Sequence, residues 1–501
     1  MAKPKSFTKQ PKTKPKKEQK LDTADDFQAA GVEFEEAAGK WRAGDATKSM
    51  RFFQRAIDVY DQGLRKFPQS LDLAYNKARV QLEIATHPIL VEQLQQPLRV
   101  VLDEALASHR YALKLDPENS DALFNASQVL TSIAESIAND EDDESARTEA
   151  EAMKVLREAL DLQTACLSLQ EQKYQEFLEQ ERFANEQVED SGEKEAVTSG
   201  PGAGSGAGTA EEDEEWFNVV EPVTSDTLLD TLLAQLATLT TFCSILGSSP
   251  GAAPPNTLAW AEDVSSGLVE KVRAISRDQP DRLQEVALTR ANLASAMLEA
   301  GYRSGKIDAE TYSQELNSVL TNVELHLNES VEGLMAKARS LLSFCSALAE
   351  SENGDARSKS TLRWNFLTAS IASLKSASAI RGISQEDLET THLLRGDASL
   401  YLYTMAFPPA SHQTAINTAS QNAKNAEVYY RNASRLSLGE DERDVASIKL
   451  AVAQHLQAYS QGGTQIDISS LFNASPRGQE WVVAQLEDML ADNLVPQALF
   501  S

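Results

Sequence analysis

Apolar residues recur along most of the chain three and four positions apart, which is the spacing of one helix face. Nothing alternates at every second residue over a useful length, so no sheet is expected. The first helical stretch, 24–66, is divided by the turn-forming pair Gly44-Asp45. Further helices are predicted over 71–85, 98–115, 120–137, 146–163, 227–246, 258–275, 281–303, 308–325, 328–350, 360–379, 384–405, 412–436, 441–457 and 480–493. The pattern therefore predicts an all-α protein.

One register occurs twice in the first part of the chain, at an offset of 49 residues. A small residue, a bulky one, a second small one and a proline follow at spacings of four, three and five: Ala56, Tyr60, Gly63 and Pro68, then Ala105, His109, Ala112 and Pro117. The register continues as Asp72, Tyr75, Asn76, Ala78 and Val80, then Asp121, Phe124, Asn125, Ser127 and Val129. A period of this size indicates stacked supersecondary units.

The segment Ala112-Leu-Lys-Leu-Asp-Pro117 closely resembles the join between two tetratricopeptide repeats. In that family, two small residues flank a bulky one on the second helix, and a proline follows. The resemblance implies a solenoid of helical hairpins. The long helix 46–66 and the insertion His87–Pro97 account for a repeat longer than the usual 34 residues or so.

The composition divides the chain into five predicted parts. Glycines alternate with other residues over 200–208, but no strand precedes them, so this is a flexible linker and not a phosphate-binding loop. Beyond it the helices persist while the consensus residues fade. The parts are a disordered lysine-rich tail (1–22), tetratricopeptide repeats (23–183), an acidic and Gly-rich linker (184–215), divergent tetratricopeptide-like helical repeats (216–460), and a loop with a C-terminal capping helix (461–501).

The chain is strongly acidic, with 75 acidic and 47 basic residues and a net charge of −28. Eight lysines lie within residues 1–20, so the remainder is more acidic still. Such a body repels nucleic acid and anionic membranes and suits a basic protein partner, although acidity also serves solubility alone. We expect no stretch that is long and apolar enough to cross a bilayer. The tail lysines Lys12, Lys14, Lys16 and Lys17 are candidates for recognition by a nuclear import receptor, which predicts a cytoplasmic and nuclear protein; the alternative is a solubilising tail.

The sequence offers little that indicates catalysis. Cys166, Cys243 and Cys345 lie far apart on apolar stretches, so we expect reduced, buried thiols in an intracellular protein. The six histidines show no ligand spacing, and His109 occupies a core position of the repeat. Motifs for a nucleophile, zinc, calcium or phosphate are not found. We therefore expect no catalytic residue, cofactor or metal, and no enzyme.

Four polar residues on the predicted first helices are candidate client-binding residues: Asp72, Asn76, Asp121 and Asn125. In tetratricopeptide domains that clamp acidic tails, asparagines of this kind hold a peptide backbone. Here Asp121 stands where that clamp needs lysine, and Asn125 stands where it needs arginine. An acidic tail is therefore not expected as the ligand, and a basic ligand is.

The chain also resembles a fungal family of tetratricopeptide-repeat assembly chaperones for large-subunit ribosomal protein four. The resemblance covers about residues 30–170 and rests on Trp41-Arg-Ala-Gly-Asp45, Arg51-Phe-Phe-Gln-Arg-Ala56, Asp72-Leu-Ala-Tyr-Asn76, His109-Arg-Tyr-Ala-Leu-Lys-Leu-Asp-Pro117 and Phe124-Asn-Ala-Ser-Gln-Val129. It implies a non-enzymatic escort that carries a new, basic ribosomal protein to the nuclear pre-ribosome.

Two other functions fit the same features. The acidic interruption 140–144 and the acidic linker are also typical of histone chaperones whose tetratricopeptide repeat is interrupted by acidic residues. A tetratricopeptide scaffold that joins the subunits of a larger complex is a further alternative.

Overall fold

The computed structural model of the chain describes residues 21–138, 146–190, 222–249, 251–327, 329–351, 354–463, 466, 468–472 and 475–499. Several features predicted from the sequence lie outside the described residues: the lysines Lys12, Lys14, Lys16 and Lys17, the acidic runs 140–144 and 211–215, and the glycine-rich stretch 200–208. Within the described residues the chain is helical and contains no strand, so the predicted all-α fold is confirmed.

The helices form two compact units, residues 1–136 and 137–501. The boundary falls near the end of α6 (Ser120–Ala138). The tetratricopeptide part predicted from the sequence is 23–183, and the boundary between the compact units falls inside it. The physical reason is that α7 (Ala146–Asp190) packs against α8 (Ser225–Ser248), where the Gln163 amide donates to Thr238 Oγ1 at 3.0 Å.

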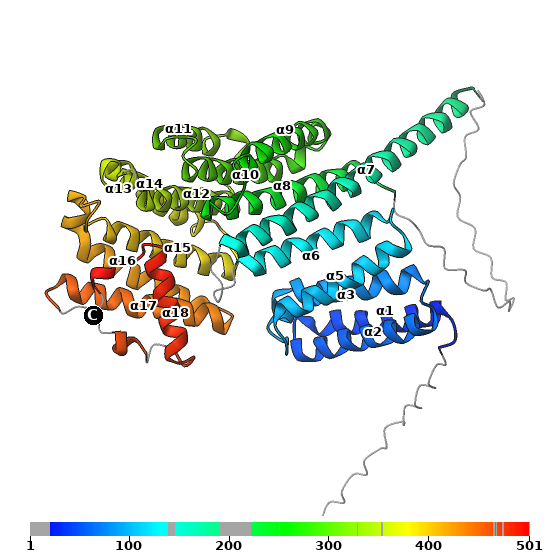
Figure 1. Cartoon of the computed structure of the whole chain (residues 1–501), viewed down its shortest axis with the longest axis horizontal. Helices are drawn as coiled ribbons and strands as arrows, with labels where there is room; N and C mark the ends of the chain where they lie inside the picture. The colour runs from blue at the N-terminus through cyan, green and yellow to red at the C-terminus, as the bar shows by residue number, and fades with distance from the viewer. Residues whose placement is uncertain are drawn as a thin grey trace, which may run out of the picture. The chain divides into compact units, whose positions relative to one another are not determined.

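Unit 1 is a stack of helical hairpins in which each long helix between residues 24 and 115 packs on the next long helix in sequence (Figure 1). Polar caps set where the helices begin. The Thr23 side chain accepts from Asp26 N and the Asp26 carboxylate from Thr23 N, while Asp45 Oδ1 accepts from Lys48 N at 2.9 Å. The helices before α6 are α1 (Ala24–Arg42), α2 (Ala46–Lys66), α3 (Leu71–Thr86), α4 (Pro88–Val91) and α5 (Leu98–Leu115).

Small residues let the unit 1 helices approach closely. A Cβ on Gly31 in α1 would overlap the ring of Tyr60 in α2, and a Cβ on Gly63 would lie 2.8 Å from Leu73 Cδ1 in α3. Tyr60 is fully buried, and so is His109, its counterpart in α5. The small–bulky–small register of the sequence is therefore the contact surface between neighbouring helices.

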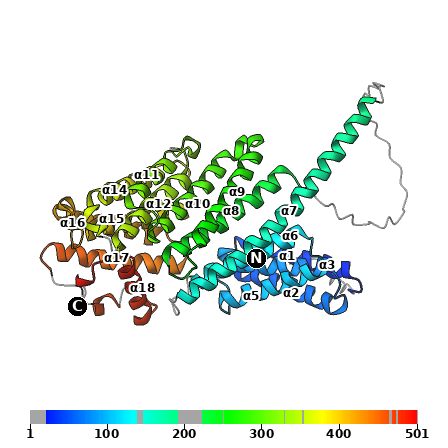
Figure 2. The ribbon, with the colours of Figure 1, turned by 45° about the horizontal axis from the view of Figure 1, so that its top comes forward.

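Unit 2 repeats the same construction over a longer distance (Figure 2). From α8 to α17, long helices pack on those next to them in the chain, as expected for a solenoid. Besides α7 and α8, the long helices are α9 (Thr257–Ile275), α10 (Leu283–Arg303), α11 (Ala309–Leu320), α12 (Val331–Glu350), α14 (Ser360–Ala377), α15 (Gln385–Thr404), α16 (Gln413–Leu436), α17 (Glu440–Ser460) and α18 (Gln479–Ala491). Short elements between them are η1 (Ser276–Asp278), η2 (Pro280–Arg282), η3 (Val323–Leu325), α13 (Asp355–Ser358), η4 (Ile468–Leu471) and η5 (Gln497–Leu499).

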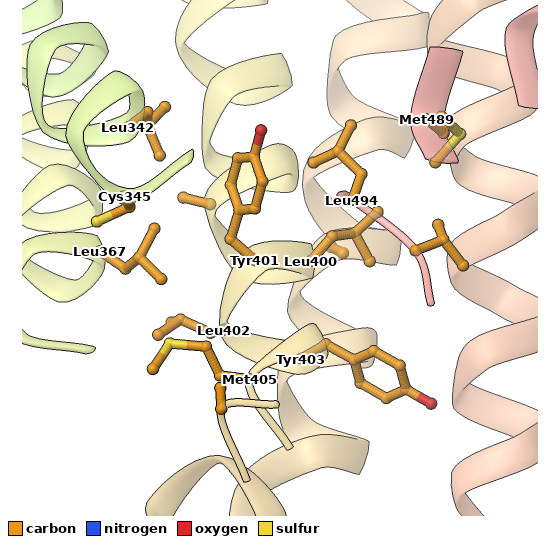
Figure 3. Close-up of a cluster of buried hydrophobic side chains, with 14 of the residues drawn as sticks. Leu342, Cys345, Leu367, Leu400, Tyr401, Leu402, Tyr403, Met405, Met489 and Leu494 are labelled. Atoms are coloured by element: carbon orange, nitrogen blue, oxygen red, sulfur yellow. The ribbon is translucent and has the colours of Figure 1, made fainter. Parts of the chain in front are cut away.

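The centre of the unit 2 core lies around α15 (Figure 3). Leu400, Tyr401, Leu402 and Tyr403 are consecutive, and all four are buried. Four consecutive buried side chains point in different directions around a helix, so α15 contacts neighbours on several sides. This explains why α15 has no single apolar stripe in its sequence.

The consensus register recurs in unit 2, where sequence reading did not recognise it. Ala426, Tyr430 and Ala433 of α16 have the spacings of four and three, and all three are fully buried. Tyr430 packs against Gly396 of α15 as Tyr60 packs against Gly31. The expectation that the consensus fades in the second half is therefore wrong for α15–α16.

Two helices differ from the expectations. Helix α7 was predicted to end near 163, with a linker from 184, but it continues to Asp190. Helix α8 is long and apolar enough to cross a membrane, contrary to the expectation that no stretch is. However, 67% of its most apolar 18-residue window is buried inside the structure, as in a core helix.

Candidate protein-binding face

The four candidate client-binding residues lie on two helices of unit 1. Asp72 and Asn76 are on α3, and Asp121 and Asn125 are on α6. A spacing of four residues places both members of each pair on the same side of their helix. Side-chain caps begin both helices just before these residues: Ser70 Oγ accepts from Leu73 N, and Asn119 Oδ1 accepts from Ala122 N at 2.9 Å.

The two helices meet through a tyrosine. Asn125 Nδ2 of α6 donates to the hydroxyl of Tyr75 in α3 at 3.2 Å. Burial raises the pKa of Tyr75, and the Asp121 carboxylate nearby raises it further, while Arg79 and Asn125 lower it. We call the surface formed by Asp72, Tyr75, Asn76, Asp121 and Asn125 the α3–α6 face.

Most polar groups of the α3–α6 face are not used within the fold. Asp72 and Asp121 are exposed, and Asn76 is half-buried. None of these three side chains makes a hydrogen bond or ion pair with another of the residues that the structure describes. The structure thus joins Asn125 to α3, while Asp72 and Asn76 share α3 with Tyr75 but are not bonded to α6. Two carboxylates and an amide remain available to a ligand.

Ion pairs between α1 and α3 hold α3, one of the two helices of the α3–α6 face, in place. The Glu35 carboxylate accepts a hydrogen bond from the Tyr60 hydroxyl and pairs with Arg79, while Arg42 pairs with Glu83. Burial would lower the pKa of Arg79, but Glu35 beside it raises this pKa on balance. The ion pairs therefore fix the position of α3 relative to α1.

Sequence reasoning missed Tyr75, Arg79 and Glu35 as parts of the α3–α6 face and its support. A signal was present for Tyr75 and Arg79, because they follow Asp72 at three and seven residues, the spacing of one helix face. Glu35 gave no such signal, because its two partners lie on different helices, 25 and 44 residues away.

Acidic and basic residues are distributed unequally among the helices of unit 1. Helices α1, α3 and α6, which include the α3–α6 face, carry nine acidic and four basic residues. Helices α2 and α5 carry four acidic and eight basic residues. The acidic excess of unit 1 therefore lies on α1, with five acidic and two basic residues, and on α6, with two acidic residues and no basic one, while α3 is balanced.

The described part of the chain contains no group of three or more His, Cys, Asp or Glu side chains placed to hold a metal ion. His109 is fully buried, and burial lowers its pKa to about 4, with the backbone of Ala78 nearby opposing that shift. An imidazole in this position is neutral and part of the core.

Two fungal proteins match short parts of the chain. No family model matches the chain. A UPF0656 protein of Schizosaccharomyces pombe is 35% identical over 124 residues, which are 25% of this chain and 27% of that protein. An uncharacterized protein of Saccharomyces cerevisiae is 37% identical over 92 residues, 17% of this chain and 16% of that protein. The chain therefore matches about a quarter or less of the length of these relatives.

Two solved structures resemble the chain weakly. One is a circular tandem repeat protein with a novel repeat topology, at 13% identity and a TM-score of 0.26 over 94% of this chain and 98% of that one. The other is Nro1, a hypoxic regulator of sterol synthesis described as a nuclear import adaptor, at 11% identity and a TM-score of 0.30 over 86% and 94%. At these TM-scores neither resemblance bears on the function of the chain.

Proposed function

We propose that this chain is a non-enzymatic chaperone that binds a newly made, basic ribosomal protein of the large subunit and escorts it to the nuclear pre-ribosome. The observation that carries the proposal is the α3–α6 face. There, the exposed carboxylates of Asp72 and Asp121 stand beside Asn76 and Asn125, on two helices that together carry four acidic and two basic residues. Carboxylates bind lysine and arginine side chains, and asparagine amides bind a peptide main chain.

The charge separation within unit 1 supports a role in capture. A basic client is attracted toward the acidic helices, which raises the rate of association and makes it sensitive to salt. Ribosomal RNA carries a phosphate at every nucleotide and competes for the same basic side chains. Release at the pre-ribosome then follows from competition and needs no catalytic step.

The lysines Lys12, Lys14, Lys16 and Lys17 fit this function as a signal for an import receptor. In this proposal the protein moves between cytoplasm and nucleus with its client. The folded body, at a chain charge of −28, needs neither nucleic acid nor a membrane as a direct partner.

Affinity purification of the tagged chain from growing cells, at low and at high salt, tests the proposal. We expect one basic ribosomal protein of the large subunit near one-to-one, lost as salt rises. Histones in that fraction would favour the acidic histone chaperone instead. A salt-resistant set of several neutral or acidic proteins would identify a scaffold subunit and contradict the escort function.

Charge reversal then tests the α3–α6 face with the purified client. We expect Asp72→Lys/Asp121→Lys to weaken client binding by about tenfold or more, because two attractive contacts become repulsive. The matched control is Asp58→Lys/Glu92→Lys, which makes the same change in charge at exposed carboxylates outside this face. Equal affinities for the two double variants would exclude the α3–α6 face as the client site.

A further inference from the structure

A groove runs between α2 and α5 in unit 1, with α3 as its floor. It has a volume of about 670 Å³, and a hollow of about 450 Å³ adjoins it. The two share the lining residues Gln54, Ile57, Gln81 and Glu104, so they form one continuous depression. We call this depression the α2–α5 groove. It is built from helices other than α6 and contains none of the residues of the α3–α6 face.

Gln81 of α3 lies in the floor of the groove with an unsatisfied acceptor. The residue is 7% exposed, and its side-chain Oε1 has no hydrogen-bond partner among the residues that the structure describes. A buried amide oxygen without a donor is unfavourable, since it has lost water and gained nothing in exchange. Because Gln81 lines both hollows, rotation of its side-chain amide would bring Oε1 within reach of a donor N–H from a bound molecule. The main chain of an extended peptide supplies such donors.

A basic side chain without a counter-ion among the described residues, Arg51, lines one end of the groove, and two more lie next to it. Arg51 lines the smaller hollow and also a third one of about 310 Å³, which it shares with Lys48 and Arg55 of the same helix. Within the described residues none of these three forms an ion pair. Lys48 Nζ lies 3.1 Å from the ring centre of Trp41, and Arg55 lies over Phe52. These three cations all lie on α2, one of the two helices that carry the basic excess of unit 1.

We propose that the α2–α5 groove binds an extended acidic segment of a partner protein. A main-chain N–H of the segment donates to Gln81 Oε1, and its carboxylates pair with Arg51 and Arg55. The proposal goes beyond the escort function and does not depend on it, because the ligand has the opposite charge and binds a different face.

A peptide fits the groove better than a nucleic acid of equal charge. A phosphodiester backbone has no N–H group to offer Gln81. In addition, the walls include the Glu104 carboxylate and the apolar side chain of Ile57, which favour a mixed polypeptide over a row of phosphates. Asp61 on the same wall is already neutralised by Lys77, at 2.7 Å.

The test is selection of a phage-displayed library of random 12-residue peptides on the whole chain. We expect the recovered peptides to be enriched in Asp and Glu. Synthetic versions of the recovered peptides should bind three variants at least tenfold more weakly than the unchanged chain. Gln81→Leu removes the acceptor, and Ala107→Trp fills the groove from an exposed position. Arg51→Glu/Arg55→Glu reverses the charge of the two arginines. The matched controls Gln62→Leu and Ala29→Trp change exposed residues outside the groove. Both should bind the peptides with the affinity of the unchanged chain.

Several outcomes would overturn the proposal. Recovered peptides without acidic enrichment, or acidic peptides indifferent to Gln81→Leu and Ala107→Trp, would show that the groove is not their site. A 12-nucleotide single-stranded RNA that binds with the same variant profile would identify nucleic acid as the ligand. Self-association abolished by Ala107→Trp would identify a second copy of the chain. Loss of peptide binding in Asp72→Lys/Asp121→Lys, which should leave it unchanged, would assign the peptides to the α3–α6 face.

Discussion

Gly31 lies so close to Tyr60 that a side chain on the glycine would occupy the space of the tyrosine ring. The Tyr60 hydroxyl donates to Glu35. The Glu35 carboxylate also pairs with Arg79 of α3, the first helix of the next hairpin. Unit 2 contains the same joint. There Tyr430 packs on Gly396, donates to Asp397 at 2.7 Å, and Lys449 of the next helix lies 2.9 Å from that carboxylate. Each joint connects three successive helices through one tyrosine and one carboxylate.

The close approach predicts that Gly31→Ala destabilises the chain. The new methyl group must displace the Tyr60 ring in a packed site, which costs roughly 1–3 kcal/mol. Gly39→Ala is the matched control, because Gly39 lies in the same helix with nothing within 4 Å of a built Cβ. That change should stabilise by about 0.5–1 kcal/mol, since alanine favours a helix over glycine. Urea unfolding followed by circular dichroism distinguishes them, and equal midpoints would contradict the predicted contact.

We predict that the folded chain loses stability in mild acid because His109 is buried. Burial lowers its pKa from 6.5 to about 4 in the folded chain, so between these values the unfolded chain binds a proton that the folded one does not. The stability that the neutral imidazole contributes is complete above pH 6.5 and falls as the pH drops to 4, by about 3 kcal/mol.

His109→Phe removes the titrating group and keeps a bulky residue, so its stability should change less over the same pH range. Unfolding free energies of both proteins between pH 4 and 7 measure the difference. Parallel pH profiles would mean that His109 is not the group responsible.

The joint in unit 2 predicts strong coupling between Asp397 and Lys449. Their side chains are 14% and 16% exposed, so removing one charge leaves the other poorly solvated. Asp397→Asn should destabilise by roughly 3 kcal/mol. In the double variant with Lys449→Met, much of that loss should be recovered. A double-mutant cycle by urea unfolding measures the coupling, and additive effects within about 0.5 kcal/mol would show that the ion pair contributes little.

The thiols of Cys243 and Cys345 should be unreactive while the chain is folded. Burial raises the pKa of the Cys243 and Cys345 thiols to about 12. The reactive thiolate is then about a thousandfold rarer than at the ordinary value of 9. Ellman's reagent at pH 8 should modify Cys345 only in urea. Rapid modification without urea would show that the core around α15 opens readily.

The helices were largely predictable because their signals are local. The expected helix 98–115 is α5, and 412–436 differs from α16 by one residue. Gly44-Asp45 marks the first turn because Asp45 caps the helix that follows. The end of α7 was missed because its second half, out to Asp190, is polar and has no apolar stripe.

The candidate binding face was only partly predictable. The repeat register indicated Asp72, Asn76, Asp121 and Asn125, but the bond from Asn125 to Tyr75 joins residues 50 positions apart. The α2–α5 groove gave no signal in the sequence. The groove forms only where α2, α3 and α5 pack together. The packing of these three helices also decides which polar atom on α3 is left without a partner.

The sequence by itself determined the all-α class, the hairpin register and the excess of acidic residues, because periodicity, capping and composition depend on neighbouring positions. The tertiary structure decided where the chain divides into units and which carboxylates are neutralised by a partner. Those features depend on contacts between residues distant in sequence, such as Glu35 with Arg79, and local patterns carry no record of such contacts.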